Sequence, residues 1–263
     1  MRAGNQNTFG KKCFFLYPHS VIVDELILKI IENGYEVYLI HDHVNLKKLL
    51  RKYNDSIAFI NIDKVLKEPE WKEYTKGIIN NDKTKNVLIG ILTYSENAEL
   101  SKTYLFDIMV HAGFIQLKAG LKESFRILLK TLAVNEVKGQ RKYVRVKCED
   151  DTNTSFNFDY EGRFCSGIIK DISIVGMACT FNERISLPPR TRLNRIQLKL
   201  RGRLVMVSGV IAGKRIEDQK EIIVILFTSY ISEQGKEKVC NYISKKLQSN
   251  LEEEVKAVAA MPE

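Results

Sequence analysis

The sequence predicts an α/β unit followed by a β-rich unit within one chain of 263 residues. In the first half, near-continuous apolar runs alternate with amphipathic stretches, a pattern typical of buried parallel strands joined by helices. From Arg141 onward, short alternating segments separated by turn residues replace that pattern, as in an antiparallel barrel or sandwich. A chain of this length is also long enough for two domains.

The first half contains five apolar runs of strand length, each followed by a stretch with helical periodicity. This order predicts an open, doubly wound parallel α/β sheet. Asn33-Gly34 is a helix-ending signal, and Asp42 and Ser95 stand at N-cap positions or in the turns before them. The expected strands are Cys13–Tyr17, Glu36–Ile40, Ile57–Ile62, Val87–Thr93 and Phe114–Leu117, and the expected helices are Val21–Glu32, Val44–Tyr53, Glu68–Ile79, Ala98–Val110 and Leu121–Ala133.

The second half predicts an antiparallel β-barrel closed by a C-terminal helix over Glu233–Leu251. Its expected strands are Tyr143–Lys147, Ser155–Phe158, Arg163–Ile172, Gly176–Phe181, Arg195–Leu200, Arg203–Ile211 and Glu221–Phe227. We therefore divide the chain into an α/β domain (1–135), a linker (136–145), a barrel domain (146–247) and a tail (248–263). Within the tail we expect Leu251–Glu263 to fray.

Composition excludes several classes of protein. Apolar residues make up 44% and charged residues 28%, as in soluble globular proteins. No apolar run approaches the ~18–20 residues that span a bilayer, and the apolar run after Lys11-Lys12 is too short for a secretory signal, so we expect a cytoplasmic protein. The five cysteines form no CxxC pair, which favours neither a zinc site nor a disulfide framework.

The basic excess of the chain lies in its second half. Residues 138–247 carry 21 Lys and Arg against 12 Asp and Glu, a net charge of +9. Such an excess attracts partners that bear phosphates. Six arginines fall close together and are either a solvated barrel edge or a surface for nucleic acid or an acidic protein: Arg184, Arg190, Arg192, Arg195, Arg201 and Arg203.

Two short motifs suggest a binding site in this basic half. Arg141 and Arg145 form an RxxxR in the linker, and Asp171-Ile172-Ser173-Ile174-Val175-Gly176 forms a DxSxxG further along. A guanidinium pairs with phosphate oxygens or with the guanine O6/N7 edge. A carboxylate accepts from guanine N–H groups, and glycine permits a close backbone approach.

These motifs, at this spacing and at the start of a β-rich segment, resemble the PilZ family of bacterial cyclic di-GMP receptors, including spirochaetal two-domain members. The resemblance covers residues 138–247. It implies a cyclic di-GMP receptor without enzymatic activity, resident cofactor or metal, in which the ligand bridges linker and barrel and changes the domain arrangement. The implied site comprises Arg141, Arg145, Asp171, Ser173 and Gly176, flanked by Lys138 and Gln140.

The resemblance does not predict how many cyclic di-GMP molecules bind. In the family, the residue before RxxxR affects whether one or two bind, and here that residue is Gln140. Each motif also has a purely structural alternative. The arginines would be ordinary linker charges, Asp171 and Ser173 would form an Asx turn, and Gly176 would mark a β-bulge.

The first half resembles the receiver domain of response regulators over residues 11–134. Asp63, Thr93 and Lys118 end the third, fourth and fifth strands, at the positions of the family's phosphoacceptor, hydroxyl and lysine. The acidic pair that holds Mg²⁺ in receivers is replaced by Tyr17-Pro18-His19-Ser20. We therefore expect a degenerate receiver that is not phosphorylated. The distinct N-terminal domain of spirochaetal PilZ proteins is the alternative for this half.

The remaining candidate motifs are interpreted as structural and not as binding or catalytic sites. His41-Asp42-His43 has no further ligand set and is interpreted as a polar helix start, and Trp71 with Tyr74 as a packing pair. No catalytic or phosphate-cradling motif occurs. The leading hypothesis is a cyclic di-GMP receptor. The alternatives are a nucleic-acid-binding regulator that uses the arginine-rich face, with or without control by the nucleotide, and a phosphorylatable response regulator.

Overall fold

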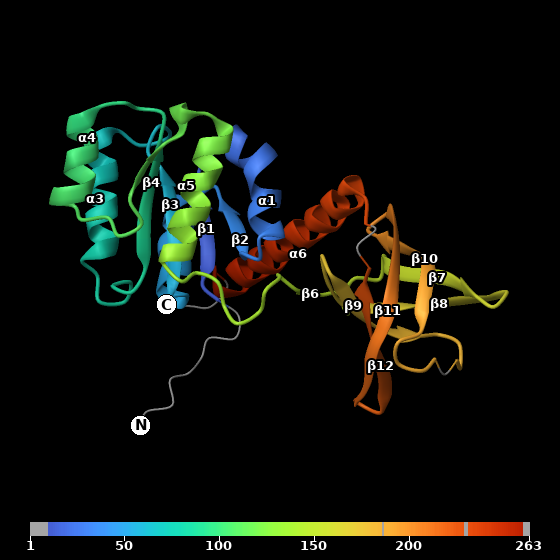
Figure 1. Ribbon diagram of the computed structural model, residues 1–263. Helices are drawn as coiled ribbons and strands as arrows, with labels where there is room; N and C mark the ends of the chain where they lie inside the picture. Colours follow the sequence, from blue (N-terminus) through green and yellow to red (C-terminus); the bar gives the residue numbers. More distant parts are fainter. Residues whose placement is uncertain (1–9, 186, 229–230, 260–263) are drawn as a thin grey trace, which may run out of the picture. The chain divides into compact units, whose positions relative to one another are not determined.

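The computed structural model describes residues 10–185, 187–228 and 231–259. The chain forms two compact units (Figure 1). The α/β unit comprises Met1–Lys142 and Leu247–Glu263, and the barrel unit comprises Tyr143–Lys246. The extreme N-terminus and the last four residues of the expected tail lie outside the described residues.

The α/β unit is built on a five-stranded parallel sheet with the order β2-β1-β3-β4-β5. The predicted doubly wound parallel sheet is confirmed. Its strands are almost wholly buried, as expected for a sheet covered on both faces. They are β1 (Lys12–Leu16), β2 (Val37–Ile40), β3 (Ser56–Asn61), β4 (Leu88–Thr93) and β5 (Phe114–Gln116).

Helices cover both faces of this sheet, with α1 and α5 on one side and α3 and α4 on the other (Figure 1). Asp42 caps α2 as expected, because its carboxylate accepts from the backbone N–H of Val44 at 2.8 Å. Two expected α-helices are partly π-helical. The helical segments are η1 (Ile22–Leu26), α1 (Ile27–Glu32), α2 (His43–Lys52), α3 (Glu68–Ile79), α4 (Ala98–Lys102), η2 (Thr103–Asp107), η3 (Leu117–Ala119) and α5 (Leu121–Val134).

Helix α6 (Glu233–Ala259) continues beyond the expected end at Leu251, which corrects the expectation of a frayed tail from that residue on. The Gln248 side chain pairs with both backbone groups of Leu39, accepting from its N–H and donating to its carbonyl, each at 3.0 Å. Further along, Glu254 accepts from Lys52 at 3.0 Å and from the Tyr53 hydroxyl. Since β2 is an edge strand, Gln248 satisfies backbone groups that the sheet leaves unpaired. These contacts stabilise the last turns of the helix.

The barrel unit contains a closed antiparallel barrel of six strands with β6 added to it. The sheet runs β6-β8-β7-β10-β11-β12-β9, and pairing of β8 with β9 closes the ring. The predicted barrel with a C-terminal helix is confirmed. Its strands are β6 (Val146–Lys147), β7 (Thr154–Tyr160), β8 (Arg163–Ser173), β9 (Gly176–Phe181), β10 (Arg192–Leu200), β11 (Arg203–Glu217) and β12 (Lys220–Phe227).

A β-bulge at Lys170 changes which side chains of β8 face the barrel core. Ile169 pairs with Cys179 and Asp171 with Ala178, so Lys170 is an extra residue without a partner on β9. Before the bulge, Cys165 and Ile169 are buried, and after it Ile172 is buried. The alternation of side chains is therefore shifted by one residue, which places Asp171 and Ser173 on the outward face.

All five cysteines are buried free thiols. Burial raises the pKa of the Cys148 thiol to about 11 and raises that of Cys179 as well. Both thiols are therefore held in the unreactive protonated form at neutral pH. Among the described residues, none of the helices is both long and apolar enough to cross a membrane.

Candidate ligand-binding site

Arg145 and Asp171 meet on the outward face of the barrel unit. The Arg145 Nη1 atom lies 3.5 Å from Asp171 Oδ1, and the side chains are 41% and 16% exposed. Arg145 immediately precedes β6, whose Lys147 is paired in register with Asp171 on β8. The short strand β6 thus positions the second arginine of RxxxR beside the aspartate of DxSxxG.

The remaining DxSxxG residues form the hairpin between β8 and β9. Ser173 pairs in register with Gly176, which leaves Ile174 and Val175 as the turn. The buried Ser173 hydroxyl donates to the Gly176 carbonyl at 3.2 Å and accepts from the Val175 N–H at 3.4 Å. Ser173 therefore fixes the shape of this turn.

Gly176 is required by a close approach of two strands. A Cβ atom at this position would lie 2.6 Å from the Ile225 carbonyl oxygen and 3.3 Å from the Leu226 Cα on β12. No larger residue fits unless the backbone of β12 or β9 moves. The bulge in β8 lies at Lys170, so the glycine serves strand contact and not the bulge.

The structure divides the expected site residues between the two units. Arg145, Asp171, Ser173 and Gly176 belong to the barrel unit, whereas Lys138, Gln140 and Arg141 belong to the α/β unit. Lys138 is engaged within its own unit. Its ammonium donates to the Asn33 carbonyl at 2.7 Å and lies 5.6 Å from the centre of the Tyr35 ring.

Lys147, which belongs to neither motif, lies beside the Arg145–Asp171 pair. It is exposed and stands directly opposite Asp171 in the antiparallel pair, so the two side chains share a face. Its sequence position, two residues after Arg145 in an extended segment, is the signal that would have placed it beside the arginine.

The arginine-rich set does not gather at one place on the barrel. Arg190 and Arg192 lie at the start of β10, whereas Arg201 and Arg203 flank the turn at its far end. The nine residues of β10 separate these ends by about 26 Å. Arg201 is already paired with Asp151 at 2.6 Å. A nucleic acid or acidic partner for this set stays a prediction.

A polar network attaches helix α6 to the barrel within its own unit. Asp151 accepts from Arg201 and, at 3.3 Å, from the Tyr242 hydroxyl. Burial acts to raise the pKa of Asp151, but the hydrogen bond and charge of Arg201 outweigh it and hold that pKa below its usual value. Beside it, the buried Lys246 lies 2.7 Å from both carboxylate oxygens of Asp150 and lowers the pKa of that group.

The residues at the receiver-like positions Asp63, Thr93 and Lys118 are engaged in contacts within the α/β unit. The Asp63 carboxylate accepts from the Thr93 hydroxyl and, at 2.7 Å, from the Tyr94 N–H. The buried His19 places its Nε2 atom 3.3 Å from the same carboxylate, and Lys118 is paired with Glu96 at 3.3 Å. Burial lowers the pKa of His19 despite the nearby carboxylate, so the ring is neutral at pH 7.

Other candidate features have structural roles. His43 accepts or donates a hydrogen bond at 3.0 Å with the Tyr17 hydroxyl, and Trp71 packs edge-on against Tyr74 at 5.4 Å. Within the described ranges, no group of three or more His, Cys, Asp or Glu could hold a metal ion.

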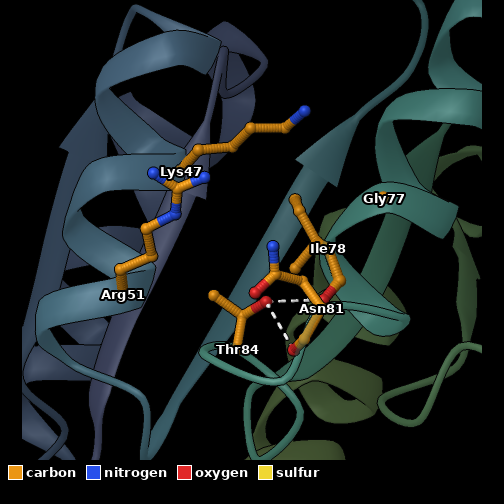
Figure 2. A pocket seen from close by; sticks show the side chains of 6 residues that line it. All are labelled: Lys47, Arg51, Gly77, Ile78, Asn81 and Thr84. Carbon is orange, nitrogen blue, oxygen red and sulfur yellow. Dashed lines mark hydrogen bonds between the residues drawn. The ribbon is translucent and has the colours of Figure 1, made fainter.

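A small pocket of about 110 Å³ lies between α2 and the end of α3 (Figure 2). Lys47 and Arg51 line one side, and the other side includes Thr84, whose hydroxyl donates to the Ile78 carbonyl at 2.6 Å. Because the carbonyl end of a helix is electronegative, these two cations suit the end of α3 itself.

No family model matches this chain, and no curated protein matches it. Among solved structures, the PilZ domain of YcgR from Escherichia coli with c-di-GMP is similar at 14% identity and a TM-score of 0.36, over 44% of this chain and 98% of that one. The MrkH–c-di-GMP complex of K. pneumonia is similar at 18% identity and 0.35, over 46% and 56%. Mn²⁺-bound response regulator Rcp1 is similar at 15% identity and 0.39, over 47% and 92%.

The chain spans about half of the YcgR chain solved with c-di-GMP. The sheet orders of this chain establish its own architecture. It consists of a five-stranded doubly wound α/β unit and a closed antiparallel barrel with a C-terminal helix.

Proposed function

We propose that this chain is a cyclic di-GMP receptor that acts by binding and not by catalysis. The observation that supports it most strongly is the placement of Arg145 beside Asp171, 3.5 Å apart on the outward face of the barrel. The Ser173–Gly176 hairpin adjoins this pair on the same strand. A cation, an acceptor and a tight backbone turn are thus assembled in one place.

This arrangement matches the chemistry of a guanine nucleotide. The Watson–Crick edge of guanine presents the O6 acceptor beside the N1–H and N2–H donors. Asp171 accepts from these donors, while the neighbouring Arg145 donates to O6 and N7 or to a phosphate oxygen. Adenine lacks this donor pair, so Asp171 gives the site its preference for guanine.

Arg141 extends the proposed site into the linker. It belongs to the α/β unit, whereas Arg145 belongs to the barrel unit. We propose that a ligand held by both arginines bridges linker and barrel and changes the domain arrangement. This requires that the ligand bind the two arrangements with different affinities. Small-angle scattering of the full chain with and without saturating cyclic di-GMP measures the change, and identical curves would contradict it.

Calorimetric titration of cyclic di-GMP tests the receptor function. Each charge-assisted hydrogen bond contributes about 1.5–3 kcal/mol, so an Arg141→Ala/Arg145→Ala variant should bind at least ~100-fold more weakly than the wild type. Asp171→Ala should reduce the ratio of the affinity for cyclic di-GMP to the affinity for cyclic di-AMP. Arg203→Ala, which removes an exposed arginine at the start of β11, serves as the matched control and should bind normally. Absence of binding by the wild type would reject the proposal.

A further inference from the structure

Two residues outside the motifs lie on the same outward face as Asp171 and Ser173. Lys147 on β6 stands opposite Asp171, and on the other side Leu226 of β12 stands opposite Gly176. Asp171 and Ser173 are themselves paired with β9. Because directly opposed residues of antiparallel strands share a face, these side chains lie on one face of the sheet across β6, β8, β9 and β12. On this face Lys147 and Leu226 are exposed, whereas Ser173 and Gly176 are buried.

The middle of this surface is formed by small residues. Asp171 is opposed by Ala178, and Ser173 is opposed by Gly176, so β9 presents at most one side-chain carbon at each position. The Leu226 Cδ2 atom lies 3.3 Å from the place that a Cβ of Gly176 would occupy. Leu226 thus leans over the glycine, and it is 50% exposed, which leaves apolar surface for a partner to cover.

The opposite end of the surface is cationic. Lys147 is exposed, and Arg145, two residues earlier in extended backbone, projects to the same side. Asp171 is the carboxylate beside both of them, so the three charges sum to a net positive charge. A cation pair of this kind favours a phosphate over a neutral ligand.

We infer that Lys147 and Leu226 determine ligand specificity at this surface, which rests on the proposed function. Lys147 contacts a phosphate of the cyclic dinucleotide, and the exposed Leu226, which covers Gly176, packs against the face of a guanine. The two residues are three inter-strand spacings and two residues along the strands apart, about 16 Å over the sheet. The polar end selects for the phosphodiester and the apolar end for the base.

Titration of cyclic di-GMP into the full-length Lys147→Ala and Leu226→Ala variants tests this inference. Loss of the charge-assisted contact should weaken binding about 10-fold and make it less sensitive to salt. Loss of the apolar contact should weaken binding about 5-fold without changing the salt dependence. Lys199→Ala and Leu204→Ala are matched controls, since both residues are exposed on neighbouring strands β10 and β11 and Leu204 is 52% exposed.

The outcomes separate this inference from the function on which it rests. If the wild type binds and only the Arg141→Ala/Arg145→Ala variant fails, while Lys147→Ala and Leu226→Ala bind normally, the inference is overturned and the receptor function stands. If the wild type does not bind, both are overturned. Leu226→Met keeps the apolar volume and should bind like the wild type, whereas weakened binding by this variant would contradict the apolar role.

Discussion

The side-chain amide of Gln248 forms two hydrogen bonds with the backbone of Leu39, each 3.0 Å long. The amide takes the place of a neighbouring strand at the open edge of β2. A residue 209 positions further along the chain thus completes the hydrogen bonding of the parallel sheet.

Gln248→Ala should lower the free energy of unfolding of the α/β unit by about 1–2 kcal/mol, because two hydrogen bonds are lost and one edge position is left open. Trp71, the single tryptophan of the chain, is fully buried in this unit. Its fluorescence during urea unfolding therefore reports on this unit. Gln234→Ala, at an exposed position of the same helix, is the control, and an equal effect of both changes would contradict the prediction.

Gly176→Ala should destabilise the barrel unit by about 1–3 kcal/mol, because the added Cβ would lie 2.6 Å from the Ile225 carbonyl. It should also weaken cyclic di-GMP binding. The reactivity of the buried Cys179 thiol on β9 with a thiol reagent, followed in rising urea, measures the opening of this strand. At Gly213 a Cβ would meet nothing within 4 Å, so Gly213→Ala should change stability by less than about 0.5 kcal/mol.

His19 should make the stability of the α/β unit depend on pH. Burial lowers its pKa below the ordinary value near 6.5, so the unfolded chain takes up the proton at a higher pH than the folded chain. Stability is therefore lost as pH falls through about 6.5. Urea unfolding, followed by Trp71 fluorescence at several pH values between about 7.5 and 5.5, measures this loss. The free energy of unfolding should fall less steeply with pH in His19→Phe than in the wild type. Parallel curves for the two proteins would exclude this role.

Asp63 should not become phosphorylated. Its carboxylate is already bonded to Thr93 and Tyr94, and Tyr17-Pro18-His19-Ser20 supplies no acidic pair for Mg²⁺. Intact mass spectrometry after incubation with acetyl phosphate and Mg²⁺ should give the unmodified mass. A phosphoryl adduct on the wild type that is absent from Asp63→Asn would establish the response-regulator alternative instead.

The sequence predicts the elements whose signals are local. The five parallel strands appear within one or two residues of their expected bounds, because each is a short apolar run that ends at polar or turn residues. Helix α3 occupies the expected range, Glu68–Ile79. Two spaced motifs identify Arg145 and Asp171 as ligand-binding residues, and the structure brings the two side chains to 3.5 Å, while their binding of a ligand stays a prediction.

The features that sequence reasoning misses depend on distant partners. The last turns of α6 are polar and resemble a frayed tail until Leu39, Lys52 and Tyr53 supply hydrogen bonds. The spacing of Lys147 from Arg145 is local, but its place opposite Asp171 depends on the register of β6 with β8, which no local pattern encodes. The π-helical turns of η1 and η2 also retain an apolar periodicity that is close to that of an α-helix.

The extra residue at Lys170 determines whether DxSxxG is a surface motif at all. In an uninterrupted strand, Asp171 and Ser173 would share a face with the buried Cys165 and Ile169, and their polar groups would point into the barrel core. In a strand without this extra residue, the same DxSxxG sequence would place unpaired polar side chains in the barrel core. Whether the DxSxxG side chains face outward thus depends on whether the strand before them contains this one extra residue. Two chains with identical DxSxxG sequences can therefore present different side chains to a ligand.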